Sequence, residues 1–256
     1  MERARDAVIL MAGIGSRLGM EAGVIAKPLV PIGGRPLIAY TFDALLEAGV
    51  RNVHAVMGAT SARLTAELLP LVPKRMQLHP IVNHEWQKQN GVSVLAAAGH
   101  VQAPFFLTMG DHLFEPAILD LLLAGGKREG AHLAVDRKIA RIFDLPDATK
   151  VATDGELIRE IGKELCAYDA IDTGVFLCGT EIFTYLGKAL RNGDCSLSDG
   201  IRLMAAAEKV RAIDIGEAWW QDVDTPEMLE RAEQDSARLL RQSRGGLAQE
   251  RVRCER

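Results

Sequence analysis

Short apolar runs alternate with segments of helical periodicity along most of this chain, and this alternation limits the fold more than any other feature. We expect strands at residues 7–11, 52–57, 105–109, 131–135, 175–177 and 210–214. We expect helices between them, at 37–48, 61–69, 93–99, 116–124, 180–189, 197–206 and 226–240. The early strands are apolar throughout, so both of their faces should be covered. The pattern predicts an α/β fold with a doubly wound, mostly parallel, Rossmann-like sheet.

The stretch from 136 to 174 has a different sequence pattern, without the long apolar runs of the earlier part of the chain. Residues 147–151, 154–158 and 160–163 read as short strands joined by tight turns, and Asp154-Gly155 is a favoured hairpin turn. We therefore expect a small β-rich insertion that closes over a second substrate. The predicted organisation is a domain over 1–235 containing this insertion, then an arginine-rich tail at 236–256 that frays.

Composition excludes several classes of protein. The formal net charge of −4 gives no electrostatic case for nucleic-acid binding. No segment reaches the roughly 18 apolar residues of a membrane span, and no leader peptide is expected. The four cysteines form no CxxC pair, which fits a reducing compartment. We expect a cytoplasmic protein without a membrane span, and a homo-oligomer stays open.

The first apolar run leads directly into a glycine loop with two cations. Gly13-Ile14-Gly15-Ser16-Arg17-Leu18 is followed by Lys27-Pro28-Leu29. Leu18 stands where the dinucleotide fingerprint needs its third glycine, and the Gly-Lys-Ser/Thr of a P-loop is absent. The glycines allow close approach to a base or phosphate, while Arg17 and Lys27 can bind phosphate oxygens. The alternative is a tight turn with surface cations.

Carboxylates occur at two further positions that suit a metal. Asp111 follows the strand at 105–109, at the sheet edge where open α/β folds bind ligands. Asp222 and Asp224 are two residues apart and share a face if the segment is extended. Together with the cationic loop they fit Mg²⁺-assisted phosphoryl chemistry. Helix capping is the alternative for these aspartates, and we expect His112 to be structural.

Taken together, these motifs resemble the sugar-phosphate nucleotidyltransferase family over about residues 6–235. Within it, the stretches at 86–93, 109–112, 147–151, 161–174 and 222–226 are similar to CTP:inositol-1-phosphate cytidylyltransferases. The resemblance implies the nucleotide-diphospho-sugar transferase type of fold. It also implies a Mg²⁺-dependent enzyme that joins CTP and a polyol or sugar phosphate, with inositol 1-phosphate as the first choice. The products would be a CDP-linked compound and pyrophosphate. Enzymes of this kind are often fused to a membrane-spanning synthase, and we expect a stand-alone form here.

The resemblance also implies a role for each matching residue. The catalytic set is Arg17 on the β- and γ-phosphates, Lys27 on the α-phosphate, and Asp111. The nucleotide-binding set is Ala12, Gly13, Gly15, Ser16, Asn83, Asn90 and Gly91. The acceptor-binding set is Lys163, Asp172, Thr173 and Gly174. The metal set is Asp111, Asp222 and Asp224, and the family usually has glycine at the position of Asp224, so the second ligand stays open within that pair.

Two alternatives remain at the level of sequence. One is a nucleotidyltransferase for another sugar 1-phosphate or for phosphocholine, using GTP, dTTP, UTP or CTP. The other is a non-catalytic regulatory module that binds a nucleotide.

Overall fold

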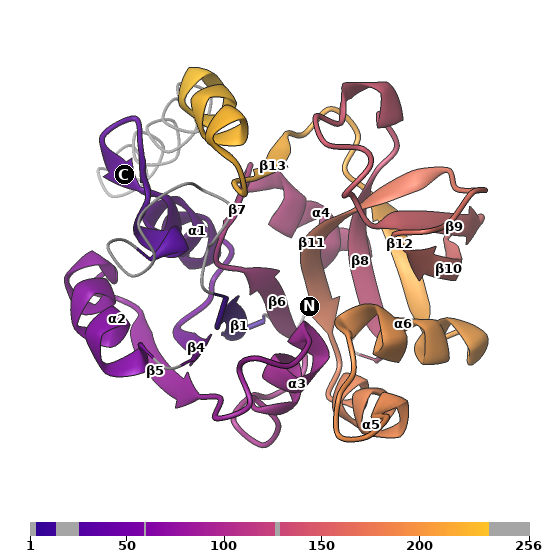
Figure 1. The fold of residues 1–256 in the computed structure, drawn as a ribbon, viewed down its shortest axis with the longest axis horizontal. Helices are drawn as coiled ribbons and strands as arrows, with labels where there is room; N and C mark the ends of the chain where they lie inside the picture. Colours follow the sequence, from indigo (N-terminus) through magenta and orange to yellow (C-terminus); the bar gives the residue numbers. More distant parts are fainter. Residues whose placement is uncertain (1–3, 14–25, 59, 126–128, 236–256) are drawn as a thin grey trace, which may run out of the picture.

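The computed structural model describes residues 4–13, 26–58, 60–125 and 129–235 of the chain. Its centre is a nine-stranded sheet in the order β5-β4-β1-β6-β11-β8-β12-β10-β9 (Figure 1). The strands are β1 (Asp6–Met11), β4 (Asn52–Met57), β5 (Gln77–Val82), β6 (Phe105–Met109), β8 (Ala131–Asp136), β9 (Lys150–Asp154), β10 (Leu157–Gly162), β11 (Ala170–Cys178) and β12 (Val210–Asp214).

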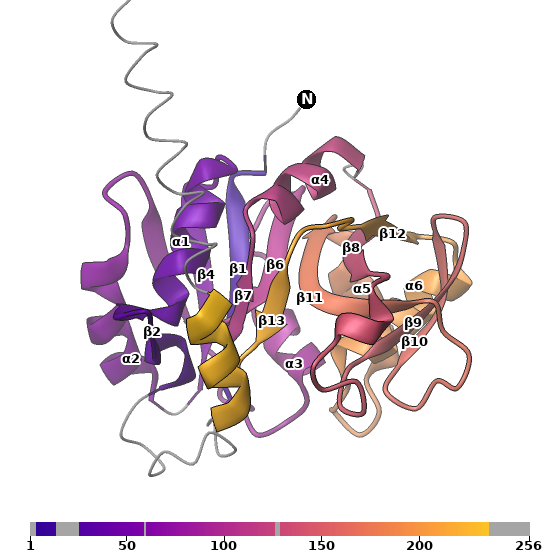
Figure 2. The same cartoon turned by 90° about the horizontal axis from the view of Figure 1, so that it is seen from above.

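Helices cover both faces of the sheet, as Figures 1 and 2 show. They are α1 (Leu37–Glu47), α2 (Ser61–Leu68), α3 (Asn90–Leu95), α4 (Ala117–Gly125), α5 (Glu181–Ala189), α6 (Leu197–Ala206) and a helix whose described part is 226–235. Successive residues of β1 enter two different cores. Val8 packs in the core that includes residues of α3, α5 and α6, whereas Ile9 packs in the core that includes residues of α1, α2 and α4. Burial on both faces explains the uninterrupted apolar runs, and the predicted α/β fold is confirmed.

The sheet is parallel in its first half and mixed beyond it. β5, β4, β1 and β6 are parallel neighbours. β11 then runs antiparallel to both β6 and β8, and β12 returns parallel to β8. β11 extends well beyond the predicted strand at 175–177. The first half of β11 was not predicted, because Asp172, Thr173 and Gly174 interrupt the apolar pattern where the β11–β8 register shifts.

The middle of the chain contains two strands where three were expected. β9 and β10 form an antiparallel pair across a turn in which Gly155 has a φ of +61°. The expected strand at 160–163 is instead the end of β10, which is bulged between Ile158 and Glu160. Both strands belong to the main sheet, because β10 pairs with β12 and β9 pairs with β11. The limits of the insertion and of the whole domain stay predictions.

A separate two-stranded sheet lies next to the carboxyl end of β6. β7 (His112–Phe114) follows β6 directly and pairs antiparallel with β13 (Trp220–Asp222), so that Asp222 stands opposite His112. A 3₁₀ turn, η2 (Lys27–Leu29), enters the same region. Short strands β2 (Pro31–Ile32) and β3 (Arg35–Pro36) lead from it into α1.

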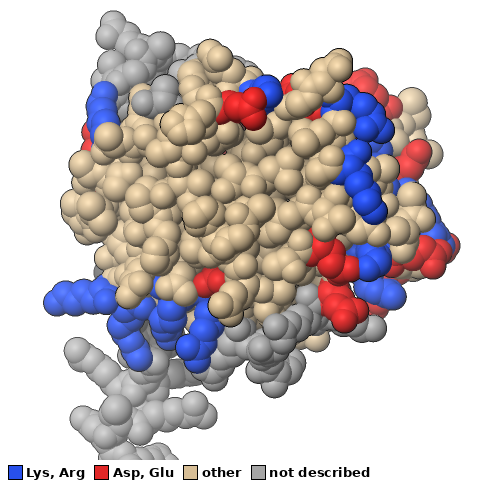
Figure 3. All heavy atoms as spheres, turned by 90° about the horizontal axis from the view of Figure 1, so that it is seen from below, with Lys and Arg blue, Asp and Glu red and all other residues tan. Residues whose placement is uncertain are grey.

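The surface view in Figure 3 shows a face whose centre carries few charged side chains, with Lys, Arg, Asp and Glu mainly along its edges. The stretch from Gln89 to Met109, which includes α3 and β6, contains no Lys, Arg, Asp or Glu. In the described part of the chain, no helix has the length and apolar character needed to cross a bilayer.

Candidate active site

A cavity of about 990 Å³ lies beside the carboxyl ends of β1, β6 and β8. Asp111 comes from the residue pair after β6, Asp222 from β13, and the far wall from the segment between β8 and β9. This is where a doubly wound sheet is expected to bind ligands. The predicted site residues that line it are Ala12, Gly13, Asn90, Asp111, Lys163, Asp172, Gly174, Asp222 and Asp224.

Lys27 joins two of the predicted metal ligands. Its Nζ donates to Asp111 Oδ2 at 3.1 Å and also to Asp224 Oδ1. The three side chains are 14%, 26% and 11% exposed, so the cluster is largely shielded from solvent. Burial opposes the charge on Lys27, but the two carboxylates outweigh it and raise its pKa. Lys27 does not itself line the cavity, and it is held as a cation by two carboxylates that do.

His112 holds the other oxygen of Asp111. His112 Nδ1 lies 2.9 Å from Asp111 Oδ1, and the imidazole stacks on Trp220 with ring centroids 6.0 Å apart. A Cβ at Gly174 would lie 2.7 Å from His112 Nε2, and Gly174 has a φ of +72°, so this position needs glycine on both counts. Burial disfavours the imidazolium, but Asp111, Asp222 and Asp172 outweigh it and raise the pKa of His112. His112 lines the cavity as well as holding Asp111, and its purely structural role stays a prediction.

The carboxylates have the oxygen donors that a hard divalent cation prefers. Burial, with Asp224 and Asp111 adding to it against the opposing effect of His112, raises the pKa of Asp222. In the arrangement seen here Lys27 binds Asp111 and Asp224 itself, and no group of three His, Cys, Asp or Glu side chains within the described ranges is arranged to hold a metal ion. The carboxylate oxygens of Asp111, Asp222 and Asp224 are suitable ligands for Mg²⁺, provided that the Lys27 ammonium leaves Asp111 and Asp224.

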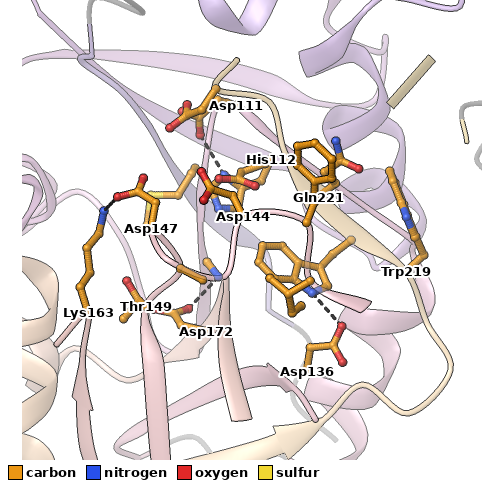
Figure 4. Close-up of a pocket in the computed structure, with 18 of the residues that line it drawn as sticks. Asp111, His112, Asp136, Asp144, Asp147, Thr149, Lys163, Asp172, Trp219 and Gln221 are labelled. Atoms are coloured by element: carbon orange, nitrogen blue, oxygen red, sulfur yellow. Dashed lines mark hydrogen bonds and ion pairs between the residues drawn. The ribbon is translucent and has the colours of Figure 1, made fainter. Parts of the chain in front are cut away.

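Further carboxylates line the same cavity. Asp172 Oδ1 accepts a 2.7 Å hydrogen bond from the Gly174 amide, and burial raises the pKa of Asp172 to about 6 despite the opposing effects of that bond and of His112. Lys163 forms a 2.5 Å ion pair with Asp147. Figure 4 draws these side chains around the cavity together with Asp144.

Three predicted site residues have other surroundings. Asn83 is buried and donates to Ser93 Oγ at 3.0 Å. Gly91 packs against the backbone before α6, where a Cβ would lie 2.6 Å from the Cys195 carbonyl oxygen. Thr173 is fully buried and its hydroxyl donates to the Ala134 carbonyl at 2.7 Å. None of the three lines the cavity. Gly15, Ser16 and Arg17 lie outside the described residues, as does the tail at 236–256.

Several cavity residues had no role assigned from the sequence, although Trp86 and Lys88 lie in the motif at 86–93. The structure adds Trp86, Lys88, Lys138, Phe143, Asp144 and Trp220. Trp220 is fixed by a 3.0 Å hydrogen bond from its Nε1 to Asp136 Oδ2. Arg231 lies over the Phe143 ring at 5.2 Å and connects the last described helix to the segment between β8 and β9. The stretch around Asp147 was singled out as a motif, and that signal pointed at this wall without identifying Asp144.

Known proteins resemble this chain along most of its length. A "Bifunctional IPC transferase and DIPP synthase" of Thermococcus kodakarensis is 36% identical over 88% of this chain and 49% of its own length. A "CMP-5'-(3-aminopropyl)phosphonate synthase" of Streptomyces rubellomurinus is 32% identical over 86% of this chain and 37% of its own length. The chain thus spans about half, or less, of the curated relatives that it matches. Among solved structures, an inositol-1-phosphate CTP transferase of T. maritima has a TM-score of 0.79 at 24% identity, covering 91% of this chain and 97% of that one. That likeness supports the fold.

The family assignment comes from a direct match to the sequence. The model of the MobA-like NTP transferase domain matches residues 7–153, which is more than half of the chain. The match spans the glycine loop, Lys27 and Asp111, and it agrees with the nucleotidyltransferase resemblance predicted from those motifs. The chain therefore belongs to the family of MobA-like NTP transferases.

Proposed function

We propose that the protein transfers the cytidylyl group of CTP to inositol 1-phosphate, giving a CDP-linked product and pyrophosphate. The observation that carries the proposal is the Lys27–Asp111–Asp224 cluster, in which Asp111 and Asp224 line a cavity that Lys163 and Asp172 also line. The likeness to IPC transferases over 88% of the chain supports CTP and inositol 1-phosphate as the pair. We also propose that the protein works in the cytoplasm.

In the proposed reaction, a phosphate oxygen of the acceptor attacks the α-phosphorus of CTP. The new O–P bond forms as the bond to the β-phosphate oxygen breaks, and pyrophosphate leaves with that electron pair. The attacking oxygen is already anionic, so the reaction needs no strong general base. Catalysis then consists of positioning and of neutralising charge on the phosphates, which are tasks for Lys27 and, as its sequence position predicts, Arg17.

We propose Mg²⁺ as the cofactor, held by Asp111 with Asp222 or Asp224. Bound there, it would supply further neutralisation of phosphate charge. The remaining residues act directly on the substrates. We assign Ala12 and Gly13 to the nucleotide and Lys163 and Asp172 to the acceptor, and all four line the cavity.

A second acceptor class has a specific observation in its favour. Asp144, Asp147 and Asp172 give the acceptor end an acidic lining. Carboxylates can accept hydrogen bonds from the vicinal hydroxyls of a polyol, and they can also bind an ammonium group. An aminoalkyl phosphonate would use the second option, and one relative is named for such a substrate.

A pyrophosphate-release assay tests the proposal. CTP, GTP, UTP and dTTP are each paired with inositol 1-phosphate, glucose 1-phosphate, phosphocholine and 3-aminopropylphosphonate. We expect the highest kcat/KM with CTP and inositol 1-phosphate, and Lys27→Ala should lower kcat by about 10²–10³, as for loss of one preorganised transition-state donor. Turnover confined to another pair would replace the substrate assignment. Nucleotide binding without turnover on any acceptor would favour a regulatory module.

A further inference from the structure

Three groups with separate tasks in the proposed reaction are bound to one another in this structure. The proposed reaction assigns Lys27 to the α-phosphate, and Asp111 with Asp222 or Asp224 to a divalent cation. Here the Lys27 ammonium occupies the space between the two carboxylates, donating to both. These residues are 84 and 197 positions away from Lys27 in the sequence, so the fold itself brings the cluster together.

The geometry leaves a competing cation little choice of oxygen. Asp111 Oδ1 already has His112 Nδ1 as a partner at 2.9 Å, and Oδ2 has Lys27 at 3.1 Å. Because His112 is itself held by stacking on Trp220, the Asp111 carboxylate cannot turn freely. Lys27 thus binds Asp111 Oδ2, the oxygen that His112 leaves to a cation, and it also binds Asp224 Oδ1.

Lys27 has the means to leave without disturbing the fold. Its backbone is anchored in η2, where its carbonyl accepts a 3.1 Å hydrogen bond from the Val30 amide. The flexible four-carbon side chain can move its ammonium while that backbone stays in place. A lysine that left these two carboxylates in a largely buried site without a replacement cation would be costly, so departure requires an exchange.

We infer that Lys27 and a divalent cation compete for the Asp111–Asp224 pair, and that Lys27 releases the pair when a nucleotide phosphate accepts it. This inference rests on the proposed function. In the nucleotide-free protein, Lys27 neutralises the pair and keeps affinity for divalent cations low. Nucleotide and cation therefore bind with positive coupling, because each favours the same movement of Lys27. The cation site is completed only when there is a phosphate for the lysine to bind.

The test measures Mn²⁺ binding to nucleotide-free protein, using the electron paramagnetic resonance signal of unbound Mn²⁺. Lys27→Met removes the competing charge at nearly constant side-chain length, and we expect it to tighten Mn²⁺ binding by about tenfold or more, given the strength of charge interactions at this range. Lys27→Arg keeps a cation and should bind Mn²⁺ as weakly as the wild type. Asp224→Asn in the Lys27→Met background should remove the gain.

A matched control removes a lysine that lines the cavity but lies outside the Lys27 cluster. Lys163→Met takes away one positive charge that is paired with Asp147 and not with Asp111 or Asp224, so it should leave Mn²⁺ affinity within about twofold of wild type, the change expected for a screened, distant charge. Equal tightening in both variants, or none in Lys27→Met, would overturn the inference. If Lys27→Met fails to fold, wild-type protein gives the answer: CMP should strengthen Mn²⁺ binding, and equal affinity with and without CMP would refute the exchange.

The two proposals fail separately. Tightened Mn²⁺ binding in Lys27→Met without pyrophosphate release from any substrate pair would keep the exchange and reject the proposed transfer. Normal turnover of CTP and inositol 1-phosphate with unchanged Mn²⁺ binding would do the reverse.

Discussion

Asp144 is a carboxylate of the cavity wall that the sequence motifs did not identify. It lies after a 3₁₀ turn, η4 (Ile139–Arg141), and lines the cavity beside residues that we assign to the acceptor. Within the described residues its side chain forms no ion pair or hydrogen bond, so it is available to a substrate. If it accepts hydrogen bonds from acceptor hydroxyls, Asp144→Asn should raise the KM for inositol 1-phosphate about tenfold, since one charged hydrogen bond contributes about 1.5–3 kcal/mol.

Steady-state kinetics with each substrate varied in turn check this prediction. The KM for CTP should stay near the wild-type value. Asp154→Asn is a suitable control, because Asp154 is an exposed carboxylate of β9 that pairs with Arg159 and lies outside the cavity. A change in the KM for CTP alone would move Asp144 to the nucleotide end.

Asp172 predicts a pH dependence of stability. Burial raises its pKa to about 6, above the ordinary value of 3.8, so the folded protein keeps a proton that the unfolded chain releases between these values. Stability from this group is therefore complete below pH 3.8 and declines as the pH rises through about 6. Asp172→Asn removes this decline. Each unit of pKa corresponds to about 1.4 kcal/mol, and partial exposure of this side chain to solvent reduces the effect. The free energy of unfolding of the variant should therefore rise by about 1–2 kcal/mol, relative to that of the wild type, between about pH 4.5 and about pH 7.5.

Urea unfolding at those two pH values measures the effect. A difference between variant and wild type that stays constant with pH would mean that Asp172 ionises normally in the folded protein.

The residue types at the site could be predicted, but their partners could not. Lys27, Asp111 and Asp224 stand out because each occurs beside a strand end or a proline at an informative spacing. The contact between Lys27 and Asp224 joins residues 197 positions apart, and local patterns carry no information on such pairs. Thr173 shows the opposite problem. It lies between two residues of the cavity wall, but strand alternation turns its side chain into the core, where it binds the Ala134 carbonyl.

At the scale of elements, strands buried on both faces were the easiest to predict. The limits of β4 and β6, which are buried almost throughout, agree with the expected ranges. Those of β12 agree as well, although its residues alternate between buried and partly exposed positions. β5 was not predicted, since Gln77, His79 and Pro80 break the pattern at the sheet edge, where side chains are more exposed. α3 begins at Asn90, three residues before the expected start, because its first turn contains a glycine that the helical pattern did not include.

That glycine, Gly91, supports a prediction about how α3 packs. A Cβ there would meet backbone atoms of Cys195 and Ser196 at 2.6–2.7 Å, and backbone cannot move aside as a flexible side chain can. Gly91→Ala should therefore destabilise the protein by about 2–3 kcal/mol through overpacking, with a matching fall in the midpoint of urea unfolding.

Gly187→Ala in α5 is the matched control. No atom lies within 4 Å of a Cβ built at Gly187, so alanine there should be neutral or stabilising by up to about 1 kcal/mol. If Gly91→Ala keeps full stability but loses CTP affinity, the nucleotide-binding role predicted from sequence is correct and the packing role is not.

At the scale of the whole molecule, β9 and β10 share a hydrophobic core with the parallel strands β1 and β4. One hydrophobic cluster contains Val8 of β1 and Val56 of β4 together with Val151 of β9 and Ile158 of β10. The sheet is likewise continuous from β5 to β9. The sequence suggested an insertion because short strands and tight turns replace the long apolar runs after residue 136. Such a pattern indicates the length of each strand but cannot show which sheet the strand joins.

A shared core predicts that the described chain unfolds as one cooperative unit. Trp86, Trp219 and Trp220 all line the cavity, so their fluorescence reports on the site, whereas far-UV circular dichroism reports on all helices and strands. The two signals should give the same urea midpoint and the same slope, since no part of the sheet can separate without exposing the apolar cluster that both halves bury. A fluorescence transition at clearly lower urea, with most of the circular dichroism retained, would contradict this prediction. It would mean that the segment between β8 and β11 unfolds as a separate unit. The cavity would then be lost before the parallel strands β5, β4, β1 and β6 unfold.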